Sequence, residues 1–259
     1  MFFEAGREAR HSADCRRSGE AAVLAALLQQ SCAPKLVFDI GANLGEWTSL
    51  LLETARESRK QIEVHAFEPC SGTYQQLAGR IRAAGWCNVR AVPLACSSRS
   101  GKATMSVYAV GAGTNSIVEK IDHESASREE VDVTSIDDYC AANGIGHVDF
   151  IKIDTEGNDF EVLLGTRGLL ETGKVELVQF EYNWRWIGAR RFLRDAFALL
   201  QPRGYAIGKI TPGGVEFYAH WCPELESYRE GNYIACKKDG LAALSPLKPS
   251  WLDTDAVGW

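Results

Sequence analysis

A strand, a glycine-containing loop and a helix follow one another early in the chain, and this unit constrains the fold more than any other feature. The run Leu36–Ile40 is rich in strand formers, Gly41–Gly45 forms the loop, and residues 46–56 carry apolar side chains at helical spacing. The order then recurs, with strands expected at 62–67 and 89–94 and a helix at 72–84. Because strand–helix–strand crossovers are right-handed, such alternation predicts a doubly wound, Rossmann-like α/β domain with a parallel sheet.

The rest of the chain continues this pattern within one domain. Further strands are expected at residues 102–108, 131–134, 148–153, 175–180, 205–210, 215–218 and 233–236. Further helices are expected at residues 20–30, 138–142, 159–164 and 190–200. A chain of 259 residues, 46% of them hydrophobic, can bury a core of this size. We expect a helical extension (1–34), a single domain (35–240) whose segment 111–130 is a lid, and an irregular tail (241–259).

Composition and charge exclude several function classes. The net charge of −6 argues against a broad nucleic-acid surface, since phosphate binding needs clustered Lys and Arg. The apolar run Ala21–Leu28 is too short to span a bilayer, and the acidic residues before it are wrong for a secretory signal. The eight cysteines occur singly, a pattern typical of reduced thiols. We therefore expect a cytoplasmic protein that acts on a small molecule, without nucleic acid or membrane, and a homo-oligomer stays open.

The glycine loop and two carboxylates indicate the cofactor. The loop has the pattern G-x-N-x-G instead of the G-x-G-x-x-G that places a pyrophosphate on a helix end. Asp39, two residues before Gly41, disfavours a pyrophosphate but suits a sulfonium and an amino group. Glu68 follows the second strand, where a carboxylate can accept hydrogen bonds from both ribose hydroxyls. These features favour S-adenosylmethionine over NAD.

Four sequence blocks resemble one known family. FDIGANLG (38–45), AFEP (66–69), VDVTSIDDY (131–139) and DFIKIDTEGNDFEVLLG (149–165) are similar to the FkbM-type methyltransferases of the class I S-adenosylmethionine-dependent superfamily, over roughly residues 36–236. The resemblance implies a seven-stranded, mostly parallel sheet whose last pair is antiparallel. It also implies O-methylation of sugars or polyketide-like natural products, and so a role in natural-product biosynthesis. Carried over by motif, the cofactor-binding residues are Asp39, Gly41, Asn43, Gly45, Glu68, Pro69, Cys96, Ser97 and Asp154.

Polar residues that follow two later strands are candidates for the chemistry. Asp154 follows strand 148–153, and Glu181 and Asn183 follow strand 175–180, so they are expected at one edge of the sheet. This oxygen set suits Mg²⁺, which would orient the acceptor and lower the pKa of its hydroxyl. Metal-free catalysis with Asp154 or Glu181 as the general base is the alternative. Lys152 is expected as a buried partner of a carboxylate, and a direct catalytic role stays open.

Acceptor binding is assigned to an aromatic run and to the lid. Aromatic rings at Tyr182 and Trp184, with Asn183 between them, could pack against a sugar or an apolar ring, or could instead close the core. Asn115 could reach the acceptor from the lid or belong to an ordinary turn. Three other functions remain open: an N-methyltransferase on the same scaffold, a NAD-dependent oxidoreductase, and a non-catalytic cofactor-binding subunit.

Overall fold

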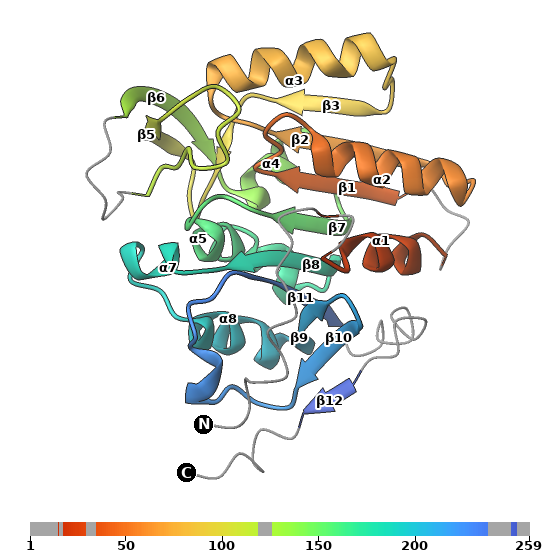
Figure 1. Ribbon diagram of the computed structural model, residues 1–259, viewed down its shortest axis with the longest axis vertical. Helices are drawn as coiled ribbons and strands as arrows, with labels where there is room; N and C mark the ends of the chain where they lie inside the picture. Colours follow the sequence, from red (N-terminus) through yellow and green to blue (C-terminus); the bar gives the residue numbers. More distant parts are fainter. Residues whose placement is uncertain (1–14, 16–17, 30–34, 119–125, 238–249, 253–259) are drawn as a thin grey trace.

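A central sheet of nine strands organises the computed structural model, which describes residues 15, 18–29, 35–118, 126–237 and 250–252 (Figure 1). In spatial order the strands are β3 (Val89–Val92), β2 (Ile62–Phe67), β1 (Lys35–Ile40), β7 (Val148–Ile153), β8 (Val175–Tyr182), β11 (Gly231–Lys237), β9 (Tyr205–Thr211), β10 (Gly214–Tyr218) and β12 (Ser250–Leu252). The first five are parallel, and β11 is antiparallel to both of its neighbours. The predicted doubly wound α/β fold with a mostly parallel sheet is confirmed.

The predicted count of seven strands is wrong. Seven strands run from β3 to β9, and two more extend the sheet beyond β9. A tight turn after Thr211 folds β10 back on β9 as an antiparallel hairpin. Residues 250–252, expected to be irregular, pair in parallel with β10. Pairing at a sheet edge depends on a partner distant in sequence, so the local pattern of the tail did not reveal this strand.

Helices cover both faces of the sheet. One face packs against α1 (Glu20–Gln29), α2 (Glu46–Glu57) and α3 (Ser71–Ala84). The other face packs against α4 (Ile136–Asn143), α5 (Asp159–Leu164), α6 (Arg167–Glu171), α7 (Arg185–Gly188) and α8 (Leu193–Leu200). Neighbouring strand residues serve opposite faces, as with Val37 in the first cluster and Phe38 in the second. The sequence did not predict α6 and α7, because helices this short show no clear periodicity.

A second, smaller sheet lies beside α3 and carries part of the predicted lid (Figure 1). Its order is β4 (Ala95–Cys96), β6 (Ser127–Thr134) and β5 (Gly101–Val107). The predicted lid extended to residue 130, but β6 already begins at Ser127 and pairs with β5 along its length. Ser116 bridges back to Ser106 of β5, and residues 119–125 lie outside the described part of the chain.

The ends of the chain are described only in part. In the predicted extension, α1 buries its apolar side chains against the sheet and shares a core cluster with α2 and α3. The proposed boundaries at residues 34 and 240 stay predictions. No helix among the described residues is long and apolar enough to cross a membrane.

Candidate active site

A cavity of about 370 Å³ opens at the carboxyl ends of the parallel strands. Its walls come from the loops after β1, β2 and β7, from Glu181 at the end of β8, and from the segment that follows β5. The strand order reverses between β1 and β7, and open α/β sheets bind ligands at such a switch point. The volume falls within the range of small-molecule sites.

The loop after β1 requires glycine at two positions. Gly41 has a φ of +81°, and a Cβ there would lie 1.8 Å from the carbonyl oxygen of Asp154. Gly45 has a φ of +78°, and a Cβ there would lie 2.8 Å from the side chain of Leu77. Any other residue would therefore push the loop off β7 or off α3. The glycines let the backbone of residues 41–44 line the cavity; of the predicted loop residues, Gly41 and Asn43 line it and Gly45 does not.

Glu68 lies under the same loop and is almost fully buried. Its Oε1 accepts a hydrogen bond from the backbone N–H of Cys70 (2.9 Å), and its Oε2 accepts one from Asn43 (3.0 Å). Burial raises the pKa of Glu68 to about 7. The two backbone hydrogen bonds lower this pKa, whereas the nearby charges of Asp39 and Glu129 raise it. A carboxylate oxygen has two lone pairs, so each oxygen retains one for a ligand hydroxyl. Pro69 lines the cavity next to it.

Apart from the Oε2 of Glu156, which is ion-paired with Arg185 at 2.8 Å, three buried polar atoms of the cavity lining have no hydrogen-bond partner among the described residues. They are the Oδ1 of Asn43, the Nε1 of Trp47 and the Oγ1 of Thr155. Buried polar atoms are rarely left without partners, so these atoms point to a polar ligand. One acceptor, one donor and one hydroxyl suit the amino, carboxylate and hydroxyl groups of S-adenosylmethionine. The residues present therefore fit the predicted cofactor.

A buried lysine, Lys152, also lines the cavity. The Nζ of Lys152 is 3.3 Å from Asp154 and 3.4 Å from Asp39. Burial by itself would lower the pKa of Lys152, but Asp154, Asp39 and Glu20 raise it well above its ordinary value. Lys152 thus lies between two carboxylates, which agrees with the predicted carboxylate partner, and a direct catalytic role stays a prediction.

Asp39 is one of the predicted cofactor-binding residues. Its side chain has no exposed surface, accepts a 2.6 Å hydrogen bond from Thr48, and is not part of the cavity lining. Its Oδ1 has no hydrogen-bond partner among the described residues, and its contact with the cofactor stays a prediction. The register of the sheet pairs Asp39 with Lys152 of the adjacent strand.

Two carboxylates line the part of the cavity at the ends of β7 and β8, which we call the acceptor half; the part lined by the glycine loop and Glu68 is the cofactor half. Asp154 and Glu181 both line the acceptor half, as predicted, because the adjacent strands β7 and β8 end there. Burial raises the pKa of Glu181 well above its ordinary value, and the charge of Asp154 adds to the effect. Asn183 donates a 2.6 Å hydrogen bond to Glu181. A carboxylate with a raised pKa is suited to accept a proton near neutral pH.

The aromatic run predicted to bind the acceptor does not line the cavity. Tyr182 is fully buried, lies edge-to-face with Trp186, and donates a 2.8 Å hydrogen bond to Glu226. Asn183 is fully buried beneath the site, and Trp184 is 40% exposed outside it. Side chains alternate along a strand, so Glu181 and Tyr182 face opposite sides of β8. The alternative reading, in which this run closes the core, describes Tyr182 correctly.

Only some of the remaining predicted residues line the cavity. Asn115 and Cys96 line the cavity, whereas Ser97 does not. The side chain of Asn115 is engaged in its own turn: it accepts from the N–H of Tyr108 and donates to the carbonyl of Ala109. Asn115 therefore forms part of the cavity wall, but both its amide oxygen and its amide nitrogen are already hydrogen-bonded within the turn.

Several lining residues escaped the sequence analysis. The main ones are Glu20, Trp47, Thr155, Glu156, Asn158, Glu230 and Asn232. Thr155, Glu156 and Asn158 belong to the block that carried the family resemblance, and they could have been found there. Glu20, Glu230 and Asn232 gave no local signal, because their positions depend on how α1 and β11 pack against the sheet.

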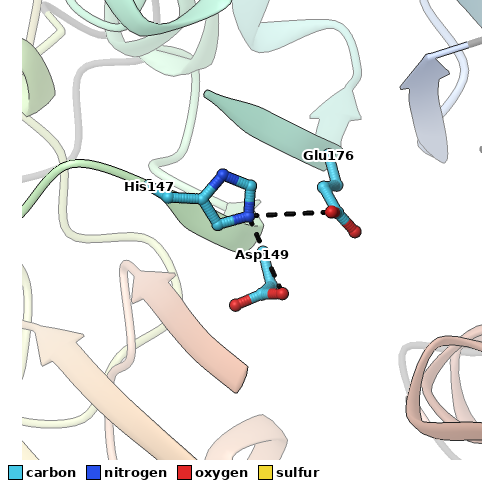
Figure 2. A group of neighbouring side chains, drawn as sticks. All are labelled: His147, Asp149 and Glu176. Carbon is cyan, nitrogen blue, oxygen red and sulfur yellow. Dashed lines mark ion pairs between the residues drawn. The ribbon is translucent and has the colours of Figure 1, made fainter. Parts of the chain in front are cut away.

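Among the described residues, one set of three His, Cys, Asp or Glu ligand atoms lies within 4.8 Å of one another: His147, Asp149 and Glu176 (Figure 2). None of the three lines the cavity. His147 Nε2 is 3.8 Å from Asp149 and 3.7 Å from Glu176, at the opposite ends of β7 and β8. Lys35 already pairs with Asp149 at 2.9 Å. This cluster is an ion-pair network and contains none of the predicted Mg²⁺ ligands Asp154, Glu181 and Asn183.

Comparisons with solved structures find similar proteins at low sequence identity. The FkbM methyltransferase of Methylobacillus flagellatus KT is 17% identical, with a TM-score of 0.49, and the match covers 81% of this chain and 47% of that one. The chain therefore spans about half the length of that protein. An rRNA methylase from Streptococcus thermophilus is 12% identical, with a TM-score of 0.45, and the match covers 84% and 93%.

A third similar structure is SMU.1697c from Streptococcus mutans, which was solved in complex with SAH. It is 8% identical, with a TM-score of 0.45, and the match covers 84% of this chain and 95% of that one. A search of curated protein sequences found no match. The Methyltransferase FkbM domain matches residues 39–227, from Asp39 through the cavity-lining loops to the segment before β11. Because this match spans most of the sequence, the chain belongs to the FkbM family of S-adenosylmethionine-dependent methyltransferases.

Proposed function

We propose that the protein transfers the methyl group of S-adenosylmethionine to a hydroxyl oxygen of a sugar or natural-product small molecule. The observation that carries this proposal is Glu181, a buried carboxylate with a raised pKa in the cavity that also contains the glycine loop and Glu68. The cofactor supplies an electrophilic methyl group on a sulfonium. With the cofactor bound, Glu181 would accept the proton that the acceptor hydroxyl loses when its oxygen takes the methyl group, and S-adenosylhomocysteine would be the leaving group.

The cofactor half of the cavity would hold the ligand through the loop and Glu68. Glu68 accepts from the two ribose hydroxyls, and the backbone of residues 41–44 lies against the methionine end. Asn43, Trp47 and Thr155 satisfy their buried polar atoms on the ligand. Lys152 holds the carboxylate of Asp154 at the boundary with the acceptor half.

Replacing Glu68 with Ala is expected to weaken S-adenosylhomocysteine binding by about 1–3 kcal/mol, because two charge-assisted hydrogen bonds are lost. Glu68→Gln, which keeps one carbonyl oxygen, should lose less. Since the ionised form is the better acceptor, wild-type affinity should fall as the pH drops below about 7. Calorimetric titration measures each value.

The matched control is Glu63→Ala, on strand β2, which precedes Glu68, but outside the cavity. Its affinity for S-adenosylhomocysteine should equal that of the wild type. If the Glu68 variants also bound normally, Glu68 would have no place in the cofactor site.

We further propose that catalysis needs no metal ion. The amide of Asn183 is engaged on both sides, since it donates to Glu181 and accepts from the N–H of Arg185. Asp154 is already paired with the Lys152 ammonium. Turnover should therefore be unchanged in EDTA. Loss of turnover in EDTA, with recovery on addition of Mg²⁺, would support the magnesium mechanism instead.

Calorimetry of the protein with S-adenosylhomocysteine, beside NAD⁺, tests the cofactor first. Binding of S-adenosylhomocysteine alone, followed by methylation of hydroxylated sugars or polyketide alcohols, is the expected result. NMR of the product identifies the methylated atom, so a methyl group on nitrogen would favour the N-methyltransferase. Binding without turnover on any acceptor would favour the non-catalytic subunit.

We also infer a reducing compartment such as the cytoplasm. None of the seven cysteines in the described residues is in a disulfide, and four of them are buried. Unpaired cysteines of this number are typical of proteins kept away from oxidising environments. This supports a small-molecule acceptor met inside the cell.

A further inference from the structure

The cavity carries far more negative charge than the cofactor needs. Seven of its lining residues are Asp or Glu, and Lys152 is the single Lys or Arg among the described residues of the lining. S-adenosylmethionine brings a sulfonium, an ammonium and a carboxylate, which together make one net positive charge. Concentrated negative charge in a cleft attracts cations and repels anions. The surplus therefore bears on the acceptor.

Only two of these seven carboxylates have a cationic partner among the described residues. Asp154 pairs with Lys152 at 3.3 Å, and Glu156 pairs with Arg185 at 2.8 Å. In contrast, no Lys or Arg within the described chain lies within ion-pair distance of Glu181 or Glu230. Glu20, Glu46 and Glu68 have none either, so carboxylates without an ion pair line the cofactor side as well, and Glu181 and Glu230 are the two at β8 and β11.

The tertiary structure brings Glu181 and Glu230 to the same place. Glu230 directly precedes β11, and the register of β11 with β8 pairs Gly231 with Tyr182 and Asn232 with Glu181. Glu230 is also among the charges that raise the pKa of Glu181, so the two carboxylates interact. Asn232 lines the cavity beside them and offers an amide oxygen. Two carboxylates and an amide oxygen form a set of acceptors that a multiply donating cation satisfies.

We propose that the acceptor carries a protonated amine beside the hydroxyl that is methylated, and that this amine binds between Glu181 and Glu230. This inference rests on the proposed function, because it names the class of the acceptor. An aliphatic ammonium has a pKa near that of lysine, about 10, and three N–H donors, so it remains charged at neutral pH and bonds both carboxylates at once. The hydroxyl on a neighbouring carbon then reaches the second oxygen of Glu181.

A metal ion fits these residues less well than an amine. Carboxylates that share an ion bring their oxygens together around it. Among the His, Cys, Asp and Glu side chains of the described residues, the one group with three ligand atoms within 4.8 Å of one another is His147, Asp149 and Glu176, and none of these lines the cavity. An amine on a flexible acceptor needs no such convergence.

The test compares a matched pair of probes, glucosamine and N-acetylglucosamine, which differ in whether the nitrogen is charged. Each is titrated calorimetrically into the full chain saturated with S-adenosylhomocysteine. We expect glucosamine to bind at least about tenfold more tightly, and the difference to shrink at high salt. Glu230→Gln should remove most of the difference. Glu57→Gln, which removes an exposed charge at the end of α2 and outside the cavity, should leave it unchanged.

Equal affinities, or no binding of either probe, would overturn the inference. Methylation assays separate this failure from that of the proposed function. If S-adenosylhomocysteine binds and neutral sugars are methylated as fast as amino sugars, only the amine is wrong. If S-adenosylhomocysteine does not bind, the proposed function itself fails. Transfer of the methyl group to the amine nitrogen would also contradict the inference, since the amine would then be the nucleophile.

Discussion

Replacing Lys152 with methionine is expected to lower the free energy of unfolding by about 3–5 kcal/mol, since breaking a buried ion pair leaves an uncompensated charge. Asp39 has no exposed surface, and the Lys152 side chain is 7% exposed. Without the ammonium, Asp39 keeps one hydrogen bond from Thr48 but loses its counter-charge. Urea unfolding followed by circular dichroism measures the change in midpoint.

A double variant distinguishes the charge from the packing. Asp39→Asn in the Lys152→Met background removes the isolated carboxylate, so it should restore part of the lost stability. Lys174→Met, at an exposed position before β8, is the control and should change stability by less than about 0.5 kcal/mol. A Lys152→Met protein as stable as the wild type would show that Asp39 does not depend on this ion pair.

Replacing Glu181 with glutamine is expected to lower kcat by about 10²–10⁴-fold, the range for removal of a general base. Glutamine keeps the size of the side chain and its hydrogen bond with Asn183 but cannot accept the hydroxyl proton. Affinity for S-adenosylhomocysteine should stay unchanged, because Glu181 lies in the acceptor half. Rate assays on a methylated acceptor, together with calorimetry, measure both effects.

The pH profile gives a second signature of this base. Glu181 faces the carboxylates of Asp154, Asp159, Glu156 and Glu230, which together with burial hold its pKa well above the ordinary value. Only the ionised form accepts a proton, so kcat/KM of the wild type should rise with pH through that raised pKa. The glutamine variant should lose this rising limb. A larger loss in Asp154→Asn than in Glu181→Gln would move the role of base to Asp154.

Local sequence determined the strands and helices around the cofactor. The strand at β2 has the predicted bounds, and α2 and α3 differ from prediction by one residue at an end. Gly41 and Gly45 adopt positive φ, and Glu68 lines the cavity, where a carboxylate that binds the ribose was expected. These predictions succeeded because strand propensity, helical spacing and glycine conformation are properties of neighbouring residues. A strand end also places its next residue at the edge of the sheet without help from the rest of the chain.

The direction of each side chain and the contacts between distant segments were decided only by the tertiary structure. Tyr182 follows Glu181 directly, yet side chains alternate along a strand, so Tyr182 points into the aromatic core and Glu181 into the cavity. Asp39 was predicted beside the cofactor, and the register of β1 with β7 places its carboxylate next to the ammonium of Lys152. Glu230 enters the site because β11 runs antiparallel to β8, and β12 exists because β10 offers it an edge. Each outcome depends on a partner far away in sequence, and a local pattern carries no information about that partner.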